Sequence, residues 1–153
     1  MAIGLAAVVL KVSADLEENH REKSIAATSD PSELVTLMVR DEQAQVSTNI
    51  KSGVATITID MGSWRSTRER FEIAVSQITR KLFAKFPALN QIDYVGFKTF
   101  VNVRGQASKE VAARCTFTRR TANSVNWDNF SYKNISEIAD QFWMHPAIEA
   151  KAD

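Results

Sequence analysis

The chain has 153 residues, of which 44% are hydrophobic and 24% charged, and its formal net charge is +1 at pH 7. This length fits one domain, and the composition excludes a disordered, collagen-like or low-complexity chain. A single cysteine, Cys115, excludes an intrachain disulfide.

The charged residues are unevenly spread along the sequence. Residues 15–60 hold 9 acids and 4 bases, residues 61–120 hold 12 bases and 4 acids, and residues 121–153 hold 5 acids and 2 bases. A basic middle is typical of a surface for an anionic partner, whereas acidic flanks folded against it would neutralise it within the monomer. Both interpretations stay open at this stage.

The amino terminus is apolar without interruption from Ala2 to Leu10. A membrane-spanning helix needs about 20 apolar residues, and a signal peptide begins with basic residues. Residues 1–14 are therefore expected to be the outer end of a longer anchor, a signal segment cleaved after Val12-Ser13-Ala14, or a short buried apolar helix. Residues 15–29 are polar and predict a stalk or linker.

A helix-start signature, Asp30-Pro31-Ser32-Glu33, opens the folded part. An Asp cap accepts hydrogen bonds from the first free amides, proline suits the first helical position, and Glu follows three residues after the cap. We predict a helix from Pro31 to about Glu42. A strand over residues 34–39 is the rival prediction, because that run is rich in β-forming residues.

Two alternating runs then meet at a turn and predict a β-hairpin. Residues 46–50 place apolar side chains and a threonine on one face, and residues 55–61 return with four apolar side chains at every second position. Gly53 supplies the positive φ that a tight turn requires.

The longest predicted helix begins at Ser66-Thr67-Arg68-Glu69, a capping box, and ends at Pro87. Trp64, just ahead of it, is interpreted as a packing lid. Apolar residues recur along the helix at three- and four-residue spacing and predict a core-facing stripe: Phe71, Ala74, Val75, Ile78, Leu82 and Phe86.

A second antiparallel pair of strands is predicted over residues 92–103 and 111–119. Its packed face is assigned to the apolar alternate set, Val95, Phe97, Val101 and Val103 with Val111, Ala113, Cys115 and Phe117. The opposite face is then exposed, basic and partly aromatic, and it supplies candidate interaction residues: Tyr94, Lys98, Phe100, Arg104 and Arg114. Such a face can hold phosphates and stack bases, but it is equally typical of the solvated side of a sheet.

Aromatic residues gather in the last part of the chain, from Trp127 to Trp143. We predict a final helix that begins at Asn134 as its cap, ends at Pro146 and buries Ile135, Ile138, Ala139, Phe142 and Trp143. The loop before it closes the core as a clasp. The ends of this clasp supply the remaining candidate interaction residues: Trp127, Tyr132 and His145.

Motifs for catalysis, cofactors and metals are absent from the sequence, which has no HExxH, no CxxC and no glycine-rich phosphate loop. Cys115 falls on the apolar set of its strand, and only His20 and His145 are available as a base for it. We therefore expect no catalytic residue, no cofactor and no metal site.

Several segments resemble uncharacterised bacterial envelope proteins, many of them anchored by a lipid or a helix. The resemblance covers roughly residues 30–148 and lies in residues 53–60, Asn126-Trp127-Asp128-Asn129-Phe130, Ile138-Ala139-Asp140 and Trp143-Met144-His145-Pro146. It implies a location in the envelope, on the non-cytoplasmic side, and no activity. This chain lacks an amino-terminal lipobox cysteine, so lipidation is not implied. The order of elements also resembles small BON-like envelope domains.

The sequence thus predicts an α+β fold, with helices on one face of a four-stranded antiparallel sheet in the order α-β-β-α-β-β-α. Residues 30–148 form the single domain, and residues 149–153 are a tail. The expected function is a non-enzymatic interaction or accessory module of the cell envelope, membrane-anchored or secreted, that binds a protein or an anionic polymer. The alternative is a nucleic-acid-associated protein of a mobile element that uses Lys98, Arg104 and Arg114.

Overall fold

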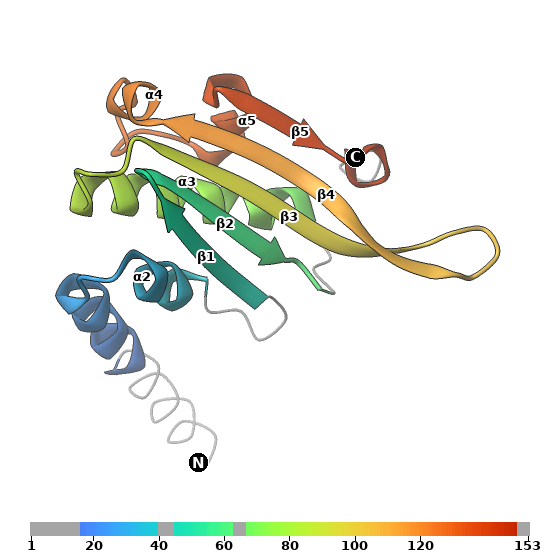
Figure 1. Ribbon diagram of the computed structural model, residues 1–153, viewed down its shortest axis with the longest axis horizontal. Coiled ribbons are helices and arrows are strands. Elements are labelled where there is room, and N and C mark those ends of the chain that lie inside the picture. Colours follow the sequence, from blue (N-terminus) through green and yellow to red (C-terminus); the bar gives the residue numbers. More distant parts are fainter. Residues whose placement is uncertain (1–15, 40–44, 63–66, 150–153) are drawn as a thin grey trace, which may run out of the picture.

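The computed structural model describes residues 16–39, 45–62 and 67–149 (Figure 1). The predicted amino-terminal segment 1–14, the packing lid Trp64 and most of the predicted tail lie outside the described residues. An α+β fold is confirmed, with one sheet and helices packed on it.

The sheet has five strands, in the spatial order β1-β2-β3-β4-β5. The bounds are β1 Gln45–Lys51, β2 Val54–Asp60, β3 Gln91–Val101, β4 Ala107–Thr118 and β5 Gln141–Met144. Three of the four pairings are antiparallel, but β2 and β3 run parallel. The prediction of four antiparallel strands was therefore wrong in detail. The helix between β2 and β3 returns the chain to the end of the sheet where β2 begins, so β3 runs in the same direction as β2.

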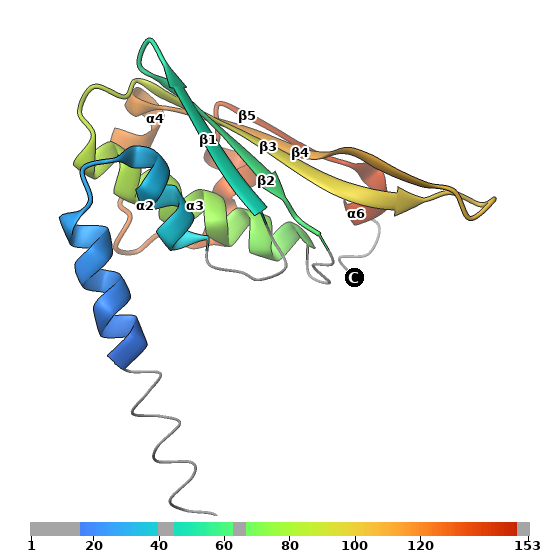
Figure 2. The ribbon, with the colours of Figure 1, turned by 60° about the horizontal axis from the view of Figure 1, so that its bottom comes forward.

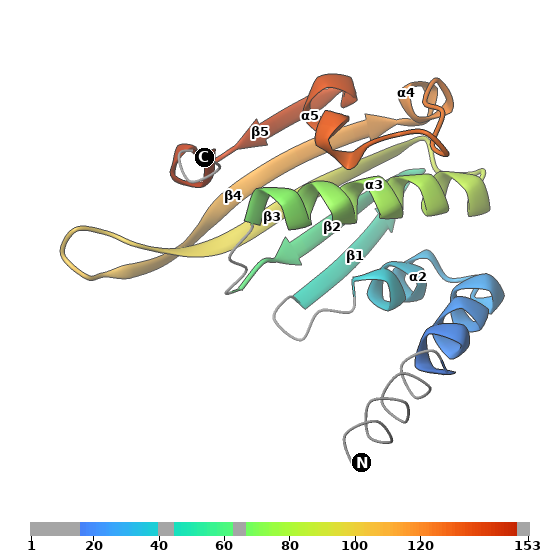
Figure 3. The ribbon, with the colours of Figure 1, turned by 180° about the vertical axis from the view of Figure 1, so that it is seen from behind.

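The described helices lie on one face of the sheet, and no described element covers its other face (Figures 2 and 3). A first helix covers residues 16–27, followed by α2 Pro31–Met38 and the long α3 Thr67–Lys85. Short elements follow β4: α4 Arg119–Asn123, the 3-10 turn η1 Tyr132–Asn134, α5 Ile135–Ile138 and, after β5, α6 Pro146–Glu149.

The single final helix predicted between Asn134 and Pro146 does not form. Helix α5 ends after Ile138 because Ala139 is extended, with ψ 144°, and residues 141–144 then pair with β4. The side chain of Asn134 makes no capping hydrogen bond. This edge of β4 needs a partner for its backbone groups, and that requirement overrides the helical spacing of the apolar residues.

Local signals set the start of α2 and the first hairpin as expected, although α2 ends at Met38 and not near residue 42 as predicted. The side chain of Asp30 accepts a hydrogen bond from the backbone N–H of Ser32 at 2.8 Å, and Pro31 occupies the first turn of α2. Ser52 and Gly53 form the turn of the β1–β2 hairpin with φ values of 53° and 79°. The predicted hairpin is therefore confirmed.

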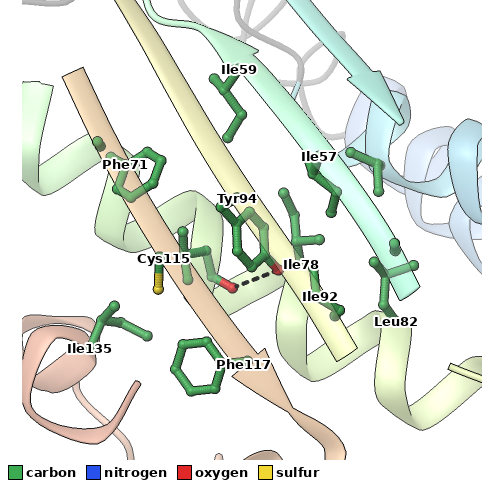
Figure 4. Packing of buried hydrophobic residues seen from close by; sticks show 14 of the residues in the cluster. Ile57, Ile59, Phe71, Ile78, Leu82, Ile92, Tyr94, Cys115, Phe117 and Ile135 are labelled. Carbon is green, nitrogen blue, oxygen red and sulfur yellow. Dashed lines mark hydrogen bonds between the residues drawn. The ribbon is translucent and has the colours of Figure 1, made fainter. Parts of the chain in front are cut away.

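The core lies between α3 and the covered face of the sheet (Figure 4). The predicted stripe of α3 is largely confirmed, since Phe71, Val75, Ile78 and Leu82 are fully buried there. The prediction of which side chains of β3 face the core was wrong: Tyr94 was expected on the exposed face. Tyr94 is 1% exposed and its hydroxyl lies 2.8 Å from the hydroxyl of Thr79 on α3. Each alternate set of β3 mixes apolar and polar residues, so the sequence did not reveal which one faces the helix.

The helix over residues 16–27, predicted as a stalk, is held to the domain by two cations at helix ends. Arg21 donates to the backbone carbonyls of Leu37 and Met38 at 3.0 and 3.1 Å, at the end of α2. Lys85 donates to the carbonyls of Ile25 and Ala26 at 2.9 and 2.7 Å. Cations satisfy helix carboxyl ends in this way, and here they fix the angle between the helices.

Candidate functional site: the projecting arm

Strands β3 and β4 continue beyond the rest of the sheet as a two-stranded projection, which we call the arm (residues 98–110; Figure 1). Pairing with β2 ends at Phe97, and pairing with β5 ends at Ala113. Every residue from 101 to 110 is exposed. No strand of the described residues pairs with the arm, so within the described chain both of its backbone edges lack a strand partner.

A β-bulge lies where the arm leaves the sheet. The register of β3 and β4 shifts between Gly96 and Phe97, which leaves Ala112 as the extra residue of β4. The carbonyl of Ala112 accepts a hydrogen bond from the backbone N–H of His145 at 2.8 Å. Bulges bend a strand and increase its twist, so this one sets the direction in which the arm projects.

The turn at the tip of the arm is fixed by Asn102. Its side-chain oxygen accepts from the backbone N–H groups of Arg104 and Gln106 at 2.9 and 3.0 Å, and its amide donates to the Gln106 side chain at 3.0 Å. Gly105 takes a positive φ of 76°. The backbone of the tip is therefore ordered before any partner arrives.

Two apolar side chains stand on this ordered turn without cover. Val101 is 66% exposed and Val103 is 104% exposed, the two highest values among the exposed large hydrophobic residues of the described chain. A single exposed valine is ordinary. Two of them within three residues, beside a projecting, hydrogen-bonded turn, place apolar surface at the end of the arm.

The predicted basic face is not assembled as expected. Arg104 lies in the turn at the tip, whereas Arg114 lies on the uncovered face of the sheet, opposite Val95 and Trp143. Lys98 donates to the carbonyl of Gly62 at 3.3 Å and lies opposite Glu110 in the register of β3 and β4. These three cations therefore occupy three separate places.

One further cation near the base of the arm is held in an ion pair. Lys109 lies 2.6 Å from the carboxylate of Asp60. The hydrogen bond from Lys109 lowers the pKa of Asp60 below its usual value, although partial burial opposes this. The pair fastens β4 to the end of β2 and leaves Arg104 as the cation closest to the exposed valines.

The candidate aromatic residues also separate. Tyr94 lies in the core, while Phe100 stacks on the ring of His145 with a centroid distance of 4.4 Å. Trp143 makes an edge contact with His145 at 6.1 Å and is 42% exposed on the uncovered face. Sequence reasoning missed Trp143 as an exposed residue because it was assigned to the buried side of a helix. The strand pairing of residues 141–144 alone places it outward.

The clasp residues Trp127 and Tyr132 have structural partners. The indole N–H of Trp127 donates to the carbonyl of Ala122 at 3.0 Å, and its ring contacts Phe117 and Phe130. The hydroxyl of Tyr132 donates to Glu69 on α3 at 2.7 Å, which raises the pKa of Tyr132. The clasp thus closes the core, as predicted, with Trp127 and Phe130 packed against it, while Tyr132 ties the clasp to α3 from the surface.

Beside the clasp lies an open groove of about 510 Å³, which we call the clasp groove. Its lining carries no charged residue. It comprises two hydroxyl side chains, three amides and three apolar side chains; the amides and apolar side chains are Asn126, Asn129, Asn134, Val125, Phe130 and Ile138.

The conditions for nucleophilic or metal chemistry are not met by Cys115 and the residues around it. Cys115 is 1% exposed, and burial raises the pKa of its thiol far above the usual value. No group of three potential metal ligands occurs in the described part of the chain. His20 lies in the first helix and His145 at the edge of the sheet, stacked on Phe100.

No family model matches the chain, and no curated protein or solved structure shows significant similarity to it. Over residues 16–39, 45–62 and 67–149, no helix combines the length and hydropathy needed to cross a bilayer.

Proposed function

We propose that this chain is a non-enzymatic interaction module, tethered in the cell envelope by its amino-terminal segment, which binds a protein partner with the tip of the arm. The observation that carries the proposal is the ordered turn at Asn102, which presents Val101 and Val103 to solvent. Arg104 adds a positive charge at the same tip.

The energetics favour a partner with a small apolar pocket. Burying one valine side chain contributes about 1.5–3 kcal/mol. The hydrogen bonds of Asn102 already restrict the turn, so little additional conformational entropy is lost on binding. A carboxylate at the rim of the pocket would pair with Arg104 and increase the association rate.

The position of the first helix supports a tether at the other end of the domain. Residues 16–27 lie far from the arm tip, at the opposite end of the molecule (Figure 1). Arg21 and Lys85 fix this helix against α2 and α3. A domain held through its amino terminus would therefore direct the arm away from the anchoring surface.

Site-specific crosslinking in the native host tests the binding surface. A photoreactive amino acid at Val103 should give one discrete adduct, and the same group at Ser52, in the hairpin turn of β1 and β2, should not. Val103→Ser should unfold at the same temperature as wild type, since its side chain is fully exposed, and should lose the partner. Equal adduct patterns at Val103 and Ser52 would remove the arm from the proposal.

Fractionation tests the tether independently. Removing residues 1–14 should transfer the chain from the membrane fraction to the soluble fraction. Trypsin added to spheroplasts should cleave the full chain at Arg104 if the domain lies on the non-cytoplasmic side. An unchanged distribution between the two fractions after the deletion would argue against anchoring. Full protection of Arg104 from trypsin would argue against a domain on the non-cytoplasmic side.

A further inference from the structure

Of the residues that line the clasp groove, Phe130 and Ile138 pack partly against the core, and the other six belong to neither the core nor the arm. Helix α4, the clasp loop, η1 and α5 all contribute to it. The apolar residues Val125, Phe130 and Ile138 are only partly buried, so they present apolar surface to whatever enters. Asn126, Asn129 and Asn134 supply amides around them. Apolar surface beside neutral polar groups can hold a ligand and orient it.

The amides of the groove retain unused hydrogen-bonding capacity. Within the described structure, the side chains of Asn129 and Asn134 make no hydrogen bond, and both residues are exposed. Sequence reasoning assigned Asn134 to a helix cap, but no capping bond forms. Asn126 accepts from the backbone N–H of Asp128 at 3.3 Å through its side-chain oxygen, which leaves its amide group to donate.

The frame that carries these amides is held in place. Trp127 is fixed by its bond to Ala122 and by ring contacts with Phe117 and Phe130. The backbone N–H of Asn129 donates to the carbonyl of Asn126 at 3.2 Å. Asp128 pairs with Arg80 of α3 at 2.7 Å, which ties the loop to the longest helix. The groove is therefore preformed, and a ligand does not have to order it.

From this arrangement we infer that the clasp groove binds a neutral saccharide. An amide side chain both donates and accepts, so it matches hydroxyl groups, which do the same. The ring of Phe130 and the aliphatic side chains match the apolar C–H face of a sugar ring. An anionic ligand would find no lysine or arginine in the lining, and a cationic one no carboxylate. An extended peptide would gain from a free strand edge, and no strand contributes to the lining.

Titration of the full chain with neutral oligosaccharides, such as chitotetraose and cellotetraose, tests the inference. In ¹H–¹⁵N spectra the side-chain amide signals of Asn129 and Asn134 should shift on binding. The double variant Asn129→Ala/Asn134→Ala should bind about tenfold more weakly or worse, since two neutral hydrogen bonds are lost. Asn123→Ala, an exposed asparagine of α4 outside the lining, should bind as wild type does.

Three results would overturn the inference. The first is an absence of shifts at about 10 mM of every neutral oligosaccharide, a concentration that detects even weak sites. The second is unchanged affinity in the double variant. The third is tighter, salt-sensitive binding of a polyanionic saccharide, because screening acts on charged ligands and hardly on neutral ones. The groove and the arm share no residue, so failure of this test leaves the arm proposal untouched.

Discussion

Replacing Arg119 with methionine should destabilise the domain strongly, because this side chain satisfies the end of α3. Its guanidinium donates to the backbone carbonyls of Leu89, Phe83 and Phe86 at 2.6, 3.0 and 2.7 Å. It also lies 4.8 Å from the ring centroid of Phe83. Methionine keeps much of the apolar stem and removes all five N–H donors.

The magnitude follows from the number and kind of these bonds. A hydrogen bond to a charged group contributes about 1.5–3 kcal/mol. Arg119 is only half-buried, so water replaces part of what is lost, and we expect a total of about 3 kcal/mol rather than the full sum. For a chain of this size that corresponds to a fall in the melting temperature of about 6–12 °C.

Urea denaturation and thermal unfolding of the wild type and two variants measure the effect. Arg120→Met, at the exposed neighbouring position, is the matched control and should change the free energy of unfolding by less than about 0.5 kcal/mol. Arg119→Lys should recover only a part, because one ammonium cannot reach three carbonyls as a planar fork does. Equal stabilities of the Arg119→Met and Arg120→Met proteins would refute the assignment of Arg119 as the element that closes α3.

Three further predictions concern the turn, the thiol and pH. Gly53→Ala should lower the free energy of unfolding by about 1–3 kcal/mol, as measured by thermal unfolding, because Gly53 has a φ of +79°. The added Cβ would also lie 2.9 Å from Asn90 Nδ2 and 3.0 Å from the carbonyl oxygen of Ala88. Unchanged stability would contradict the assigned turn. Cys115 should react with a thiol reagent only as fast as the protein unfolds, and rapid labelling of the native protein would contradict its burial. Burial alone would raise the pKa of Asp140, but hydrogen bonds from Thr118 and Thr121 lower it below 3.8; its stabilisation is therefore present above that value and lost as pH falls through the folded-state pKa. Asp140→Asn should accordingly destabilise the protein at pH 7 by about 1 kcal/mol, and this loss should shrink as the pH falls through the folded-state pKa of Asp140. A loss that stays constant with pH in urea denaturation would contradict this.

The parts of the fold that sequence predicts well are those with local signals. The stripe of α3 recurs at three- and four-residue spacing from Phe71 to Leu82, so its helical period is clear from the sequence. The β1–β2 hairpin combines alternation with a glycine turn, and α2 begins with an Asp cap followed by proline. Each of these patterns depends only on residues close together in the chain.

The errors arise where distant residues decide. Residues 141–144 have spacing compatible with a helix, and they form a strand because β4 offers an unpaired edge. Tyr94 faces inward because α3 covers that side of β3. The residues of β3 alone do not show which side the helix covers. The parallel pairing of β2 and β3 was also missed, although the long helix between two strands is typical of a crossover connection.

The candidate site was predicted only in outline. The candidate basic residues at positions 98, 104 and 114 were predicted to share one strand face, whereas the structure places them at the base of the arm, at its tip and on the opposite face of the sheet. The exposed valines of the arm were assigned to a packed face, since their alternation with polar residues resembles that of a core strand. Whether another element covers one face of a strand depends on the tertiary structure, so the alternation of residues in the sequence does not show it.

The parallel seam between β2 and β3 has a consequence for how the chain folds. The β1–β2 hairpin lies on one side of this seam and the β3–β4 hairpin on the other, and each hairpin forms from residues close together in the chain. The two halves join only when the whole of α3 has closed the loop between them. Loop closure of this kind slows folding and divides a sheet into separate cooperative units. Amide exchange at β2–β3 should therefore report the last contacts to form, and a nascent chain released before residue 91 would carry an open edge on β2.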